Sequence, residues 1–125
     1  MASEDVYIAG NSIYTFDSFG SKLEWKGGNR HCKIGKFQLR TRQEKESGKV
    51  VYSIGIECQY FDKHVCKIVQ EDSKTIMARA KKNSQEMQLR FLLRNKREDT
   101  VITIESADSS EPEGSVAWIS ITNLA

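Results

Sequence analysis

Cys58, His64 and Cys66 are the residues whose types and spacing come closest to a chemical site. His64 and Cys66 are two positions apart, so on a β-strand their side chains point to the same face. If residues 61–63 form a hairpin loop, Cys58 lies opposite Cys66, and the three side chains could begin a zinc site. A structural zinc site also needs a fourth ligand and closely spaced cysteine pairs, which the sequence lacks. We therefore predict that the cysteines pack in the core, with a metal site or a redox disulfide as alternatives.

No other pattern in the sequence is typical of an enzyme or of a cofactor site. The glycines at 27–28 lack the spacing and the following lysine of a phosphate-binding loop. The carboxylates concentrate in predicted turns, at residues 44–46, 71–72, 98–99 and 108–113, so a paired acid and base in a cleft has no support. These observations predict a noncatalytic protein without a cofactor.

Basic residues concentrate between Lys74 and Arg97, where eight lysines and arginines face a single acid, Glu86, and give a local charge of +7. The candidate binding residues in and around this patch are Arg79, Lys81, Lys82, Arg90, Leu92, Arg94, Lys96 and Arg97. A patch of this kind attracts the phosphates of nucleic acid or of an anionic lipid such as a phosphoinositide, or an acidic peptide. The alternative is a solvated sheet face whose charges only resist edge aggregation.

Leu92 gives the basic patch an apolar element. In the predicted register Leu92 and Val101 form an outward cross-strand pair beside Arg90 and Arg94, and exposed apolar groups rimmed by arginine suit a protein interface. The alternative is that both faces of the sheet are buried there. We predict protein–protein interaction or assembly, through this surface or by strand addition at an open edge, and nucleic acid or anionic lipid as the alternative partner. The sequence does not specify the oligomeric state.

The elements that carry these residues are predicted to be β-strands. Residues 50–60 alternate between apolar and polar at period 2, and the proposed hairpin places Ile56 opposite Ile68. Residues 6–9 and 13–16 flank a turn and predict an opening hairpin, and Leu23 and Trp25 predict a short strand. The inward positions change from even to odd near residues 35–36, which predicts a β-bulge there.

Further hairpins follow from the same alternation. Residues 76–80 and 87–93 give matching apolar faces, although the helix formers within 73–93 leave one helix as the alternative. A loop at 95–98 would place Leu89 opposite Ile104 and Phe91 opposite Ile102. Residues 116–122 predict a last strand with Trp118 on the face opposite its aliphatic residues.

Length and composition agree with an all-β fold. The chain has 125 residues, a net charge of +2, one proline and three cysteines. We predict one antiparallel β-domain over residues 1–125, a meander-rich barrel or sandwich of about nine to ten short strands, with a mobile acidic loop at 105–114. The odd number of cysteines fits a reducing compartment, and the first residues do not resemble a secretory signal. The expected location is intracellular, either cytoplasmic or nuclear.

Overall fold

The chain folds into two β-sheets that pack face to face. The computed structural model describes residues 13–15, 30–94, 96–105, 107–108 and 116–123. Its strands are β1 (Ile13–Thr15), β2 (Arg30–Ile34), β3 (Phe37–Glu46), β4 (Lys49–Glu57), β5 (Val65–Gln70), β6 (Thr75–Lys82), β7 (Gln85–Leu92), β8 (Val101–Glu105), β9 (Ala107–Asp108) and β10 (Val116–Thr122). Two 3-10 turns, η1 (Cys58–Tyr60) and η2 (Asp62–His64), lie between β4 and β5.

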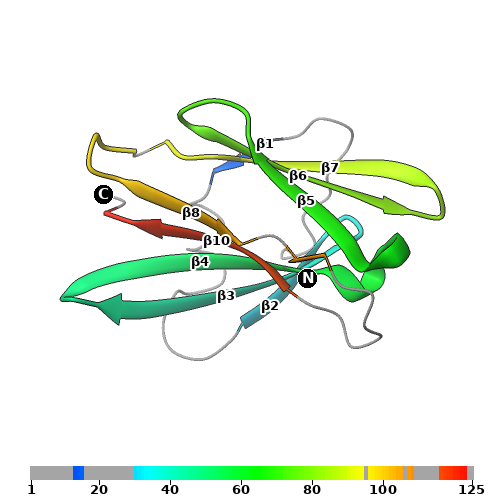
Figure 1. Ribbon diagram of the computed structural model, residues 1–125, viewed down its shortest axis with the longest axis horizontal. Coiled ribbons are helices and arrows are strands. Elements are labelled where there is room, and N and C mark those ends of the chain that lie inside the picture. Colours follow the sequence, from blue (N-terminus) through cyan, green and yellow to red (C-terminus); the bar gives the residue numbers. More distant parts are fainter. Residues whose placement is uncertain (1–12, 16–29, 95, 106, 109–115, 124–125) are drawn as a thin grey trace, which may run out of the picture.

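Each sheet contains five described strands, in the orders β1-β7-β6-β5-β9 and β2-β3-β4-β10-β8. The described pairings are antiparallel except that of β1 with β7, which is parallel. Figure 1 shows the sheets as two layers, with β5, β6 and β7 in one and β3, β4 and β10 in the other. The all-β prediction is confirmed, and the described strands form a sandwich rather than a closed barrel.

The core lies between the two sheets. Alternate side chains along the strands point inward and form it. On β10 the alternating residues Ala117, Ile119 and Ile121 are all fully buried, which confirms the predicted last strand. They pack in one hydrophobic cluster with residues of the opposite sheet, including Ile76 and Phe91. Full burial of an isoleucine or phenylalanine side chain stabilises a fold by roughly 1.5–3 kcal/mol, so this cluster is the main stabilising feature.

The hairpin predicted from residues 76–80 and 87–93 is confirmed as β6 and β7. Ile76 pairs with Phe91 and Ala78 with Leu89, so the apolar faces match. The turn at Asn83 and Ser84 has positive φ values of 55° and 64°. Such values are typical of two-residue hairpin turns whose twist suits the flanking strands. The helix alternative is wrong because burial of an alternating face outweighs the intrinsic helix propensity of alanine and methionine.

The β-bulge predicted near residues 35–36 is wrong, because the chain reverses there. Ile34 at the end of β2 pairs directly with Phe37 at the start of β3, and Gly35 has a positive φ of 59°. A two-residue turn changes the parity of the inward residues in the same way as one inserted residue. Both interpretations therefore explain the phase change, and the turn also gives β2 a partner.

The predicted pairing of Ile56 with Ile68 is also wrong. Ile56 pairs with Leu39 on β3 and with Ala117 on β10, whereas Ile68 pairs with Ala78 in the other sheet. Residues 58–64, which we call the arch, carry the chain from one sheet to the other. Because β4 already has a neighbour on each side, the following segment crosses the core instead of folding back as a hairpin.

The connection from β7 to β8 crosses between sheets in the same way. Ile104 pairs with Ile119 and Ile102 with Ile121 on β10, so the predicted pairing of β8 with Leu89 and Phe91 is wrong. Arches and hairpins both leave alternate residues facing one core, and hydrophobic alternation does not distinguish between them.

The predicted loop at 105–114 begins later than expected. Glu105 ends β8, and Ala107–Asp108 form the short strand β9. This strand pairs with Val65 and Cys66 of β5, and Ala107 is buried against the core. Residues 109–114 lie outside the described residues. The same holds for residues 6–9, Leu23 and Trp25, so the opening hairpin and its neighbouring strand stay predictions. In the described part of the chain, no helix is long and apolar enough to cross a membrane.

Candidate binding surface

A hollow lies on the outer face of the sheet that contains β5, β6 and β7, beside the turn that joins β6 to β7. Its volume is about 520 Å³. The residues that line it are Asp62, Lys63, Val65, Lys67, Arg79, Ala80, Lys81, Ser84 and Glu86. They come from η2, from the start of β5 and from the β6–β7 hairpin, so the hollow is built where the arch meets this hairpin.

Strand register brings the basic side chains of the hollow together. Lys67 on β5 pairs with Arg79 on β6, and Lys81 lies two positions further along β6. Successive side chains of a strand alternate between the two faces, and Cys66 and Ala80, which neighbour these residues in sequence, are buried in the core. The three basic side chains therefore share the outer face.

Asp62 fixes the wall of the hollow that the arch provides. Its carboxylate oxygens accept hydrogen bonds from the backbone N–H groups of Asn83 at 3.1 Å and Ser84 at 2.9 Å. A charged acceptor makes such bonds stronger than neutral ones. The Asp62 carboxylate is thus occupied by the chain itself and holds η2 against the β6–β7 turn.

Three lysines that line the hollow have no ion-pair partner among the described residues. Arg79 forms an ion pair with Glu86, but no described carboxylate forms an ion pair with Lys63, Lys67 or Lys81, all of which are exposed. Four basic and two acidic side chains line the hollow, which gives it a local charge of +2. An anionic group of a ligand would therefore meet three lysines for which the described part of the chain provides no competing carboxylate.

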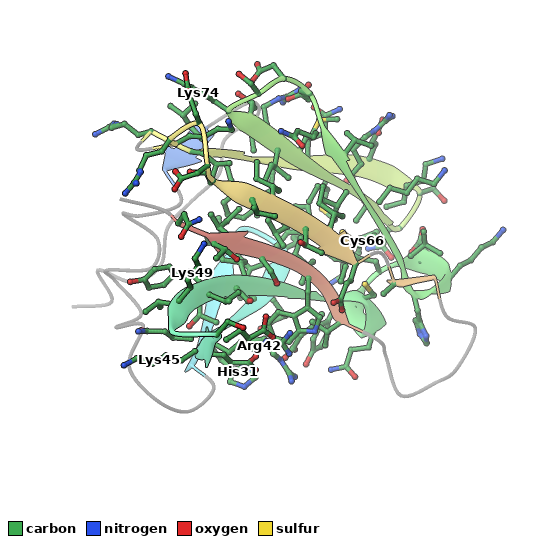
Figure 2. The ribbon with its side chains drawn as sticks, turned by 60° about the vertical axis from the view of Figure 1, so that its left-hand side comes forward. His31, Arg42, Lys45, Lys49, Cys66 and Lys74 are labelled. Carbon is green, nitrogen blue, oxygen red and sulfur yellow. The ribbon has the colours of Figure 1, made fainter. Side chains whose placement is uncertain are left out.

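The predicted binding residues divide between the two ends of the β6–β7 hairpin. Arg79 and Lys81 line the hollow, and Lys82 is half-buried at the end of β6 beside the turn. Arg90 lies further along β7, where its Nε is 2.8 Å from Glu71 Oε1 and its Nη1 donates to Gln88 Oε1 at 3.1 Å. The remaining members follow at and beyond the far end of β7, namely Leu92, Arg94, Lys96 and Arg97. Figure 2 labels Lys74 at the start of this hairpin, on the other sheet from Arg42.

The predicted outward pair of Leu92 and Val101 does not form. Leu92 is half-buried on β7 and lies between Thr75 of β6 and Thr15 of β1. Val101 is 54% exposed and pairs with Thr122 in the other sheet. The two residues separate because the chain changes sheets between β7 and β8, and the prediction of an apolar interface centre at this pair is therefore wrong.

Sequence reasoning missed Lys63 and Lys67. Lys67 alternates with the buried residues Cys66 and Ile68, so its outward direction could be read from the sequence. Its place beside Arg79 depends on the pairing of β5 with β6, and the place of Lys63 depends on the arch. No local signal fixes either of these long-range contacts.

Cys58 and Cys66 lie together in the core. Their side chains are 0% and 1% exposed, both are free thiols, and both belong to the same hydrophobic cluster. The hydrogen bond with Cys58, together with burial, raises the pKa of the Cys66 thiol. Among the described residues, no three His, Cys, Asp or Glu side chains are grouped so that they could hold a metal ion, and His64 does not complete a site with the two thiols.

The outer face of the other sheet carries a second charged cluster. Glu57, only 6% exposed, accepts a hydrogen bond from Arg40 Nε at 2.8 Å and a second one from the same guanidinium, and His31 Nδ1 lies 3.3 Å from its Oε1. The buried Glu57 carboxylate is thus matched by the partly exposed guanidinium of Arg40. Removing Arg40 would leave a buried carboxylate without its main partner, so we assign this cluster to stability.

Gly55 lets a tryptophan lie flat beside this cluster. It pairs with Trp118, and a Cβ atom added to Gly55 would lie 2.8 Å from Trp118 Cζ3 and 2.6 Å from Val116 Cγ1. The guanidinium carbon of Arg42 lies 3.9 Å from the centroid of the Trp118 ring on the outer side, a cation–π contact. Trp118 does face away from the aliphatic residues of its strand, as predicted.

Replacing Gly55 with alanine is expected to lower the free energy of unfolding by about 1–3 kcal/mol, because the new methyl group overlaps the Trp118 ring and overpacks the surface. Urea denaturation measures the loss. Thr103→Ala, an exposed change in the same sheet, is the control and should stay within about 0.5 kcal/mol of wild type. A Gly55→Ala protein as stable as wild type would contradict this placement of the ring.

The comparisons with known proteins give no family for the chain. No protein-family model matches it, and neither a curated protein nor a solved structure is significantly similar to it.

Proposed function

We propose that this protein is a noncatalytic β-sandwich domain that mediates protein–protein interaction by binding an acidic segment of a partner in the hollow beside the β6–β7 turn. The observation that carries the proposal is the set of three exposed lysines, Lys63, Lys67 and Lys81, which line one hollow and have no described ion-pair partner. Aspartate or glutamate side chains of a partner would neutralise them without displacing an ion pair between described residues.

The composition of the lining favours a peptide over a nucleic acid. Glu86 and Asp62 contribute negative charge that would repel a continuous phosphate backbone, and none of the described residues that line the hollow is aromatic and suited to base stacking. Val65, which is half-buried, adds a small apolar surface that suits the side chains between the acidic residues of a peptide. Nucleic acid and phosphoinositide remain the alternative ligands, supported by the same unpaired lysines.

An affinity capture from native extract tests the ligand class. The immobilised protein is incubated with untreated and with nuclease-treated extract at low and at moderate salt, and bound proteins are identified by mass spectrometry. We expect proteins with acidic segments to be retained after nuclease treatment and to be retained less at the higher salt, because screening weakens exposed charge contacts. Capture that disappears with nuclease treatment would favour nucleic acid instead.

The location of the protein is part of the same proposal. We propose that it acts inside the cell, in the cytoplasm or the nucleus, since its free thiols Cys58 and Cys66 are compatible with a reducing compartment.

A further inference from the structure

The thiols of Cys58 and Cys66 are placed so that one bond between them would join the two sheets. Cys58 begins η1 directly after β4, and Cys66 is the second residue of β5, which belongs to the opposite sheet. Figure 2 labels Cys66 near the start of β5, beside the arch. Both side chains are buried in the same hydrophobic cluster at the two ends of the arch, and the side chain of each cysteine shifts the pKa of the other.

We propose that Cys58 and Cys66 are a redox-active pair that oxidises to an intramolecular disulfide between the two sheets. This role goes beyond filling the core, because either cysteine alone would serve as a small apolar residue, whereas two adjacent thiols give a site of two-electron chemistry. The proposal does not depend on what the hollow binds.

A glutathione-type disulfide is the oxidant that we name for this step. The thiolate of one cysteine attacks a sulfur of the oxidant, breaks its disulfide bond and releases one low-molecular-weight thiol. The second cysteine loses its proton and attacks the protein sulfur of the mixed disulfide, which releases the second low-molecular-weight thiol. In total the two cysteines lose two protons and two electrons, and the oxidant is reduced to two thiols.

Cys58 is the better candidate for the first attack. The hydrogen bond from Cys66 lowers the pKa of Cys58, and a lower pKa increases the fraction of thiolate. Because both side chains are buried, the oxidant reaches them only when the arch opens locally, so oxidation of the folded protein should be slow. The arch is the structural element that controls access.

The experiment uses the whole chain in glutathione redox buffers, followed by acid quenching and tryptic mass spectrometry without reduction. Trypsin cleaves after Lys49, Lys63 and Lys67, so the proposed disulfide would join peptide 50–63 to peptide 64–67. The same equilibration is carried out in urea, which gives the disulfide equilibrium of the unfolded chain. A Cys32→Ser variant removes the third thiol as a competitor.

We expect the linked peptide pair to form, with an equilibrium constant in the folded protein at least about tenfold higher than in urea, because folding holds the thiols together. Cys66→Ser should abolish the linked pair and leave Cys58 as a thiol or a mixed disulfide with glutathione. An equilibrium constant equal to or lower than that in urea would overturn the proposal, as would oxidation that links only Cys32 to another cysteine. The wild-type chain gives this result even if a variant fails to fold.

Discussion

Replacing Ile56 with aspartate will leave the protein unfolded or severely destabilised. The Ile56 side chain is fully buried on β4 between Leu39 and Ala117, where no described cation could compensate a carboxylate. An unpaired charge in such a site costs several kcal/mol or more, a large part of the roughly 5–15 kcal/mol that stabilises a typical domain. Circular dichroism and urea denaturation measure the effect.

Ile56→Val is the matched control for this change. It keeps the side chain apolar and β-branched and should cost only about 0.5–1.5 kcal/mol. If the aspartate variant unfolded at the same urea concentration as the valine variant, position 56 would not face the core, and the assignment of the inward faces of β4 would be wrong.

Reversing two charges in the hollow will have the largest effect on binding. We expect Lys67→Glu combined with Lys81→Glu to weaken binding of a short synthetic peptide rich in aspartate and glutamate at least about tenfold, equivalent to about 1.4 kcal/mol. The melting temperature should change little, because both lysines are exposed and form no ion pair with a described carboxylate. Fluorescence anisotropy with the labelled peptide gives the two dissociation constants.

Lys33→Glu combined with Lys36→Glu is the control for net charge. Both lysines are exposed on the β2–β3 hairpin of the other sheet, and the change in net charge is the same. An effect equal to that of the Lys67 and Lys81 variant would show that the peptide senses only the total charge of the protein. The hollow would then have no special role.

Elements whose partners are close in sequence could be predicted from the sequence alone. Ala78 and Leu89 are joined by a short hairpin, so their matching apolar faces were enough to predict this hairpin, and the structure adds its register. Ile119 and Ile121 alternate strictly with less buried residues, so the last strand was recognised without knowledge of its neighbours.

Elements whose partners are distant in sequence could not be predicted. Ile56 and Ile68 face the same core from opposite sheets, and a hairpin would give them the same alternation. For the same reason, only some of the residues that line the hollow could be predicted from the sequence. Arg79 was recognised from its own strand, whereas Lys63 joins it only because the arch folds over the β6–β7 turn and Asp62 holds it there.

The burial of Glu57 could not be predicted from the sequence, for a different reason. Its position on β4 is an outward one, and alternation predicts an exposed carboxylate there. It is buried because Arg40 extends over it from the neighbouring strand and forms two hydrogen bonds with it. Contacts between long side chains on one face of a sheet depend on strand pairing and on rotamers, and neither follows from hydrophobic periodicity.

The position of the bound peptide is the most direct test of the proposed function. Nitrogen-15 heteronuclear NMR spectra recorded during a titration with the acidic peptide report which backbone amides change environment. We expect saturable shifts that concentrate at Lys63, Lys67, Arg79, Lys81 and the adjoining turn, and that are lost in the Lys67→Glu and Lys81→Glu double variant. Shifts confined to the outer face of the β3–β4–β10 sheet, or to the exposed edge strand β8, would contradict it.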